Sequence, residues 1–182
     1  MLDVNYSYKR YGFLGNEFLT WLWFLTENEP KAVSEILSEP VILTLGNRIA
    51  LEKKNKDDIE KVTVKGDTAR MDEGLLALRK GAVVSEAHWV MELADQKWTF
   101  TMKGASLDIT GLKCPPTAPV RAVADIEGAV IEKAALVERP VKAVTALFSR
   151  FLTLRISSDW EKTEIPRMKK WISGKPVGKR EE

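Results

Sequence analysis

Cysteine and histidine are almost absent from this chain, since Cys114 and His88 are the only residues of their kinds among 182. One cysteine cannot build an intramolecular disulfide framework, and no zinc-knuckle spacing is present. A single histidine also excludes metal sites and proton relays that need two imidazoles. We therefore expect a reducing compartment and a protein that works without a metal or another cofactor.

Long hydrophobic runs and an excess of one charge are missing as well. The most apolar run, residues 18–25, is far shorter than the ~20 residues that cross a membrane. The first ten residues have no signal-peptide core. The chain has 28 Lys and Arg against 26 Asp and Glu, a net charge of +2. We expect a cytoplasmic protein without a membrane partner, in which any polyanion would have to bind a local basic patch.

The periodicity of apolar residues predicts an α+β fold that begins with a buried aromatic helix. Asn16 is a favourable N-cap for this helix, which is apolar nearly all round and stops before Pro30. Residues 31–39 fit a short second helix. Gly46 and Asn47 then predict the turn of a hairpin between strands 41–45 and 48–52. A charged connector over 52–61 and a short strand at 62–64 follow.

The remaining pattern predicts a helix inserted in a central antiparallel sheet and a helical C-terminal third. The inserted helix covers 67–80 and ends at Gly81, and the later strands cover 83–93, 98–102 and 107–109. A proline-rich stretch, 114–119, marks a boundary between a sheet domain over 1–116 and a helical region over 117–182. In that region we expect one helix to end before Pro140 and a second to begin there.

Catalytic motifs are scarce. The chain has no phosphate-binding glycine loop, no dinucleotide fingerprint and no nucleophile elbow, and we interpret it as a non-enzyme. His88 is expected to be a half-buried, hydrogen-bonded strand residue, and Cys114 a small packed side chain. One enzymatic alternative stays open. Glu52-Lys53-Lys54 and Asp95-Gln96-Lys97 resemble the carboxylate and lysine pattern of metal-dependent nucleases, although this pattern is common by chance.

Basic residues are concentrated between residues 53 and 80, on the expected connector and around the inserted helix. Together they could neutralise several phosphates without reading a base, whereas Asp57 and Asp58 favour the alternative of an ordinary solvated face. Arg70 would sit in a first helical turn, where backbone donors also meet phosphates, while cations in a last turn can simply complement the helix dipole. The candidate DNA-binding residues are Lys53, Lys54, Lys56, Lys65, Arg70, Arg79 and Lys80.

Four phrases occur in an order that resembles a known family. They are FLGNEFLTWLWF at 13–24, LGNRIAL at 45–51, ALRKGAVV at 77–84, and FLTLR at 151–155 before Trp160. This order is similar to the C-terminal half of the RdgC family, the recombination-associated DNA-binding proteins of bacteria and some phages. The resemblance implies a non-enzymatic protein that binds duplex DNA with little sequence preference. It also implies a ring-shaped homodimer around DNA and restraint of the RecA recombinase.

The usual family member has an N-terminal half that has no counterpart in this chain, so we expect another oligomer or a separate chain to complete a ring. The expected function is sequence-independent duplex DNA binding in recombination or its control, in a nucleoid-associated protein of a host, phage or mobile element. A structural or protein-interaction subunit without DNA binding is the alternative. We also expect a homodimer, because Trp21, Trp23 and the stripe Phe148, Phe151, Leu152 offer more apolar surface than a small chain usually buries.

Overall fold

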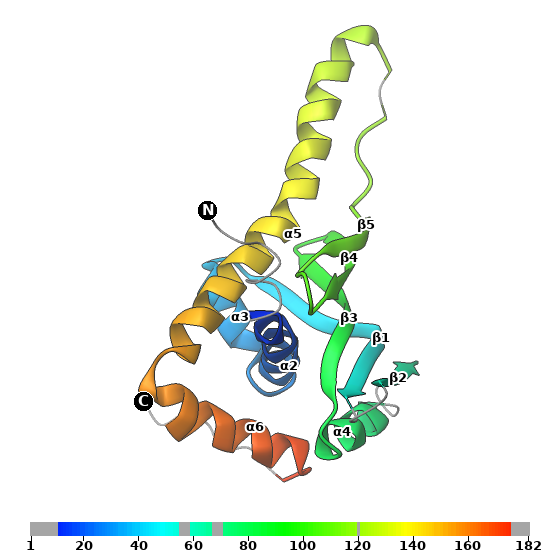
Figure 1. Ribbon diagram of the computed structural model, residues 1–182. Helices are drawn as coiled ribbons and strands as arrows, with labels where there is room; N and C mark the ends of the chain where they lie inside the picture. The colour runs from blue at the N-terminus through cyan, green and yellow to red at the C-terminus, as the bar shows by residue number, and fades with distance from the viewer. Residues whose placement is uncertain (1–10, 55–58, 67–70, 120, 176–182) are drawn as a thin grey trace, which may run out of the picture.

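The computed structural model describes residues 11–54, 59–66, 71–119 and 121–175, and it confirms the α+β class (Figure 1). Helices and strands follow one another along the chain with few long connections. The helices are α2 (Phe13–Asn28), α3 (Pro30–Leu37), α4 (Met71–Arg79), the short 3-10 turn η2 (Val123–Asp125), α5 (Ile126–Arg155), the π-helical turn η3 (Trp160–Glu164) and α6 (Ile165–Ile172). The strands are β1 (Val41–Lys54), β2 (Ile59–Lys65), β3 (Val83–Leu93), β4 (Gln96–Lys103) and β5 (Ile109–Lys113).

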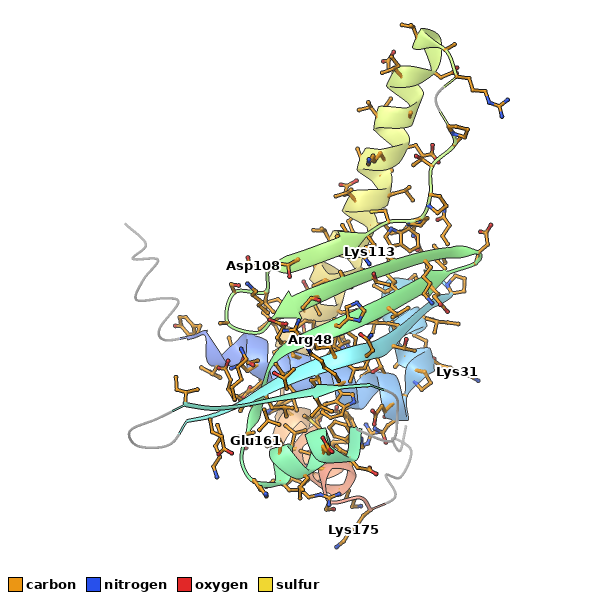
Figure 2. The ribbon with its side chains drawn as sticks, turned by 90° about the vertical axis from the view of Figure 1, so that its right-hand side faces the viewer. Lys31, Arg48, Asp108, Lys113, Glu161 and Lys175 are labelled. Atoms are coloured by element: carbon orange, nitrogen blue, oxygen red, sulfur yellow. The ribbon has the colours of Figure 1, made fainter. Side chains whose placement is uncertain are left out.

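The five strands form one antiparallel sheet in the order β2-β1-β3-β4-β5. Helices α2, α3, α5 and α6 all lie on one side of this sheet, and α4 lies at one end of it (Figure 1). Seen from the other side, the strands stand in front and no described helix crosses them (Figure 2). The sheet therefore has one covered face and one open face.

Strict alternation of side chains assigns residues to the two faces, because successive residues in a strand point in opposite directions. On β3, Trp89 and Met91 are buried against the helices, and His88 between Ala87 and Trp89 points to the open side. On β4, Trp98 and Phe100 are fully buried. Aromatic residues thus mark the covered face and leave threonines and charges for the open one.

The first helix begins earlier than the sequence indicates. Helix α2 starts at Phe13, so Asn16 is not its N-cap but lies inside the helix. Gly15 is buried there because α2 packs directly on the backbone of Gly104, and a Cβ at Gly15 would lie 1.8 Å from the Gly104 carbonyl oxygen. This glycine serves close packing of a helix on the sheet, which local sequence cannot distinguish from a helix boundary.

The hairpin predicted at Gly46 and Asn47 is wrong. Strand β1 continues through these residues, and β3 pairs with it on both sides, at Leu45 opposite Trp89 and at Ile49 opposite Ala87. The extra residues form a β-bulge, and Gly46 does not adopt the positive φ that a two-residue hairpin turn requires. The charged connector is also largely strand, since β1 reaches Lys54 and β2 begins at Ile59.

The helix break predicted at Pro140 is wrong as well, because α5 runs unbroken through it. A proline inside a helix removes the hydrogen bond to the carbonyl four residues earlier, here that of Leu136. The indole Nε1 of Trp98 donates to this Leu136 carbonyl oxygen at 2.9 Å. The core side of the sheet therefore supplies the donor that the proline cannot, and the helix continues.

The apolar residues that suggested an oligomer are buried within the chain. The ring of Phe18 in α2 packs on Phe148 and Phe151 of α5, at centroid distances of 5.1 and 5.6 Å. At the other end of α2, Trp23 meets Trp171 of α6 edge to face at 5.0 Å. These apolar surfaces are buried against one another within one chain, so they give no reason to expect a dimer.

One charged cluster lies inside this aromatic layer. Glu164 is only 1% exposed, accepts a hydrogen bond from Trp21 Nε1 at 3.2 Å, and pairs with Arg167 at 3.1 Å. Arg167 also pairs with Glu29 at the end of α2. The cluster connects α2 to η3 and α6, and its charges are compensated as buried charges must be.

Candidate nucleic-acid interface

The open face of the sheet is polar and carries a row of threonines. Thr99 of β4 lies opposite Val90 of β3, and Thr101 lies opposite both His88 of β3 and Thr110 of β5. Threonine suits a strand and leaves a hydroxyl toward solvent, where it can donate to an anion. The face is therefore built to remain in contact with solvent or with a polar partner.

Cations outnumber acids across the middle of this face. Arg48 of β1 and Lys65 of β2 are cross-strand neighbours, and Lys113 of β5 lies opposite Thr99. Arg48 also pairs with Glu86 at 3.0 Å, but its side chain stays 47% exposed. The strand positions that point to the open face carry five cations, Arg48, Lys65, Lys97, Lys103 and Lys113, and two acids, Glu86 and Glu92. Glu52 and Lys61 also lie on this face, but they form an ion pair and add no net charge.

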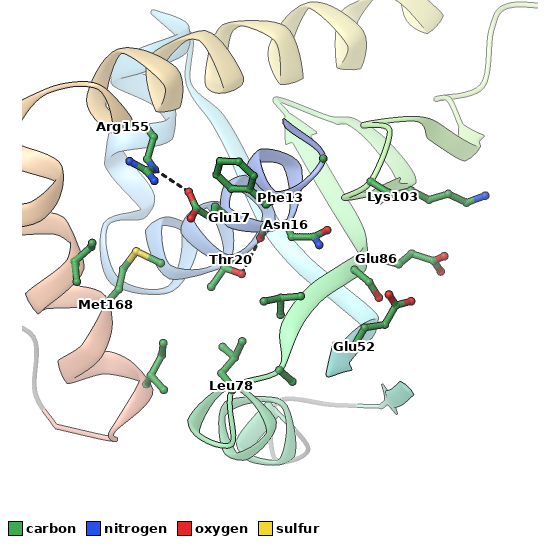
Figure 3. Close-up of a pocket in the computed structure, with 18 of the residues that line it drawn as sticks. Phe13, Asn16, Glu17, Thr20, Glu52, Leu78, Glu86, Lys103, Arg155 and Met168 are labelled. Atoms are coloured by element: carbon green, nitrogen blue, oxygen red, sulfur yellow. Dashed lines mark hydrogen bonds and ion pairs between the residues drawn. The ribbon is translucent and has the colours of Figure 1, made fainter. Parts of the chain in front are cut away.

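Figure 3 shows this division of charge from inside the molecule. The side chains of Glu52, Glu86 and Lys103 point away from α2, toward the open side of the sheet. Glu17 and Arg155 lie on the α2 side and form an ion pair at 2.8 Å. The cations that could meet a large polyanion are therefore those on the open side.

The structure does not gather the predicted DNA-binding residues on one face. Lys65 is exposed on the open face, whereas Lys53, opposite Glu60, has the register of the covered side. Arg79 donates from Nε to the Ile172 carbonyl at the end of α6, which gives it a structural role. Lys80 is exposed at the end of α4.

The side chains of the three other predicted residues lie outside the described part of the chain. Lys56 and Arg70 lie outside the described residues. Lys54 is the last residue of β1, and its side chain is outside the described part of the chain.

Arg48, Lys103 and Lys113 were not among the DNA-binding residues predicted from the sequence. Arg48 was predicted to lie in a hairpin strand, but the face of the sheet to which it points was not predicted. That direction depends on the β-bulge, which no local sequence pattern indicates. Lys103 had a usable signal, since it continues the alternation that places Trp98, Phe100 and Met102 inside. Lys113 precedes the proline-rich stretch, and only its pairing with β4 shows that it belongs to the sheet.

His88 occupies the bulge region of the open face. It is half-buried, as expected, but its Nδ1 atom is buried and has no hydrogen-bond partner, which corrects the expected hydrogen bond. Burial lowers the pKa of His88 from 6.5, and the nearby charges of Lys113 and Arg48 lower it further. The imidazole is thus neutral at physiological pH.

A cleft of about 1190 Å³ lies between α2, α4, α6 and the sheet (Figure 3). Apolar side chains such as Phe13, Leu78 and Met168 line it together with the Glu17–Arg155 pair. Four cations, Lys61, Lys103, Arg155 and Lys169, and three acids, Glu17, Glu52 and Glu86, line the cleft. The surplus of a single cation gives the cleft little preference for a polyanion over another ligand.

The nuclease alternative requires acids that converge, and the two acidic segments do not. Glu52 lies beside Val83 at the first residue of β3, while Asp95 follows the last residue of that strand. Eleven strand residues at about 3.3 Å each separate the two by roughly 35 Å. Within the described residues, no group of three or more His, Cys, Asp or Glu side chains could hold a metal ion.

Comparisons with protein-family models, with curated proteins and with solved structures gave no match to this chain. Among the described helices, none is both long enough and apolar enough to cross a membrane.

Proposed function

We propose that this chain binds duplex DNA without sequence preference, using the open face of its sheet. The observation that carries the proposal is the difference between the two faces of the sheet. No described helix covers the open face, and this face is rich in threonine and has a surplus of lysine and arginine. Phosphate contacts from such residues position a protein on DNA but read no bases. The expected affinity is therefore electrostatic and falls steeply with salt.

A duplex suits this face better than a single strand. Proteins that hold single strands stack the bases on aromatic side chains. The described open-face registers carry no Phe, Tyr or Trp, because the aromatic residues of β3 and β4 all point to the core. Five strands at about 4.8 Å spacing extend roughly 19 Å across. That width corresponds to roughly five or six nucleotides at 3.4 Å.

The family resemblance extends this proposal to a role in recombination or its control, with a recombinase as a further partner. It is the order of the four sequence phrases that supports this part. A recombinase that shares the DNA with this protein would be restrained by competition for the same backbone.

The test compares two variants with equal loss of charge. Arg48, Lys65 and Lys113 are changed together to Ala on the open face. Lys31, Lys133 and Lys162, exposed on helical surfaces, are changed together in the control. If each open-face cation contacts one phosphate, the slope of log K against log[salt] falls by about 2.7 in the first variant. The control should bind a mixed-sequence duplex like the parent.

Equal weakening of both variants would mean that only overall charge matters. Weakening of the control alone would place DNA on the helical side. Either result contradicts the proposal.

A second function, self-association, is favoured by one specific observation. The N-terminal half of α5 projects away from the body as an arm (Figure 1). Four apolar side chains on it are 43–63% exposed: Ile126, Val130, Val137 and Val141. Their spacing of four, seven and four residues places them on one face of the helix.

We propose a second copy of this chain as the occupant of that face, in an antiparallel two-fold pair. The spacing reads the same in both directions, so Ile126 would meet Val141 of the partner and Val130 would meet Val137. Charges on the arm are balanced, with Arg121, Lys133, Arg139 and Lys142 against Asp125, Glu127, Glu132 and Glu138. Two arms therefore do not repel strongly, and the arm has no attraction for DNA.

A matched pair of substitutions tests this homodimer. Val130 and Ile131 are both 63% exposed, but they point about 100° apart around the helix. Val130→Glu should convert the dimer to a monomer in light scattering, while Ile131→Glu should leave the mass unchanged. A monomeric parent at micromolar concentration, or equal effects of both changes, would refute this pairing.

A further inference from the structure

The bulge in β1 creates a notch on the open face, and His88 fills it. Leu45 and Ile49 pair with Trp89 and Ala87, so three residues of β1 stand opposite His88 alone. A methyl group at Gly46 would lie 2.1 Å from His88 Nδ1. The ring of His88 therefore packs on the backbone of Gly46, and it can take this position only because Gly46 has no side chain.

This position determines which ring nitrogen carries the proton. Nδ1 is buried and has no hydrogen-bond partner. A buried N–H without an acceptor is rarer in proteins than a bare acceptor, so Nδ1 is the unprotonated nitrogen. A neutral imidazole carries its proton on the other nitrogen, and Nε2–H is then a donor on the accessible side of the ring. The lowered pKa agrees, because full protonation would put an N–H at Nδ1.

Cationic groups flank this donor from two directions. Arg48 ends the bulge on β1, and Lys113 stands on β5, and both charges act on the ring of His88. Figure 2 shows Arg48 and Lys113 over the middle of the open face. Thr101 and Thr110, at the same register as His88, add hydroxyl groups.

We propose that Arg48, His88 and Lys113 form an oxyanion subsite that takes one phosphate group of a nucleic-acid backbone. Two cations supply charge, and the fixed Nε2–H supplies a directed neutral donor between them. Gly46 is a positioning residue, since it acts only through the ring. This inference rests on the proposed function for the identity of the ligand, but the oxyanion chemistry can be tested without DNA.

Charges around the ring decide how the subsite responds to pH. Arg48, Lys103 and Lys113 face it from β1, β4 and β5, and Glu86 faces it from its own strand. The cations and the buried Nδ1 oppose protonation, so His88 donates as a neutral group at pH 7.5 and above. Its contribution to binding should therefore be constant from pH 7.5 upward.

The single histidine makes a direct test possible by ¹⁵N NMR of the imidazole. In the free protein at pH 7.5 we expect Nε2 to be protonated and Nδ1 to be bare. Inorganic phosphate, but not chloride at equal ionic strength, should shift the Nε2 signal, and a mixed-sequence duplex should shift it at far lower concentration. A protonated Nδ1, or an Nε2 signal that neither ligand moves, would overturn the subsite.

Affinity measurements test the roles of the two residues. His88→Ala should weaken duplex binding about fivefold, the loss expected for one ordinary hydrogen bond. Gly46→Ala should cause a similar loss, and the double variant should be no worse than either single one. Gly128→Ala is the control, because a Cβ there meets nothing within 4 Å. A further loss from Gly46→Ala in the His88→Ala background would overturn the positioning role.

The outcomes separate this inference from the proposed function. If phosphate shifts Nε2 and no duplex binds, the subsite stands and DNA binding fails. If a duplex binds, the His88→Ala variant binds it with the affinity of the parent, and the Nε2 signal does not shift, then DNA binding stands and the subsite fails.

Discussion

The two faces of the sheet are made from the same strands, and they differ in almost every physical property. Trp89 and Phe100 are fully buried on the covered face, while their neighbours His88 and Thr99 stand on the open one. The covered face is filled with aromatic rings from α2, β3, β4 and α5. The open face holds hydroxyl groups, cations and one notch. The comparison shows that the fold depends on one set of alternating residues and leaves the other set to function.

Truncation of a large side chain should give the largest difference in stability between substitutions on the covered face and substitutions on the open face. Phe100→Ala removes a fully buried ring and should lower the free energy of unfolding by about 3–5 kcal/mol. Its neighbour Thr99→Ala, on the open face, should change it by no more than about 0.5 kcal/mol. Urea unfolding of both variants measures the difference. Similar losses would mean that the open face is covered in solution.

Loss of a charge should differ between the faces in the same way. Glu164→Ala removes the acceptor of the Trp21 indole and one of the two carboxylates that pair with Arg167, and it should cost about 3 kcal/mol or more. Glu86→Ala breaks the pair with Arg48, in which the Arg48 side chain is 47% exposed and the Glu86 side chain 17%, and it should cost about 1 kcal/mol or less. Chemical denaturation in low and high salt checks both values. The loss of unfolding free energy caused by Glu86→Ala should become smaller at high salt, while the loss caused by Glu164→Ala should stay the same.

The support that Trp98 gives to Pro140 should produce an intermediate effect. Trp98→Phe removes the donor to the Leu136 carbonyl and should cost about 1–3 kcal/mol. In a Pro140→Ala background, the alanine N–H can satisfy that carbonyl, so the same change should cost less. A double-mutant cycle of unfolding free energies measures this coupling. Identical losses in the two backgrounds would show that the indole acts by packing alone.

The pH dependence of stability should show the smallest effect, and it belongs to His88. The pKa of His88 is lowered in the folded state, so the unfolded chain takes up its proton at higher pH. This contribution is complete above pH ~6.5 and is lost as pH falls toward the lower folded pKa. The difference in stability between the parent and His88→Gln, followed from pH 7.5 to 5, should decline accordingly. A constant difference would contradict the lowered pKa.

Local patterns in the sequence were enough for the α+β class, the aromatic helix, the helical C-terminal third and the side-chain alternation of β3 and β4. They failed where tertiary contacts override local preference. Asn16 and Gly46 were predicted as boundaries, but Asn16 lies inside α2, and Gly46 makes room for the ring of His88 on β3. Pro140 read as a break, but an indole from β4 compensates for its missing N–H.

The residues of the candidate site were harder to predict, because the position of a charged residue in the sequence does not show on which face of the sheet it lies. Lys53 and Lys65 are close in sequence and stand on opposite sides of the sheet. Arg48, Lys65 and Lys113 are far apart in sequence and come together only through the strand order. That order depends on β1 pairing with both β2 and β3, which no local pattern specifies.

Photo-crosslinking from single positions tests the central claim most directly. A benzophenone side chain is placed at Thr99 on the open face, and in a second variant at Ser149, exposed on α5. Each variant is irradiated with a mixed-sequence duplex at low salt. If the open face binds DNA, Thr99 gives a crosslink that disappears as salt rises, and Ser149 gives none. A crosslink from Ser149 with none from Thr99 would contradict the account.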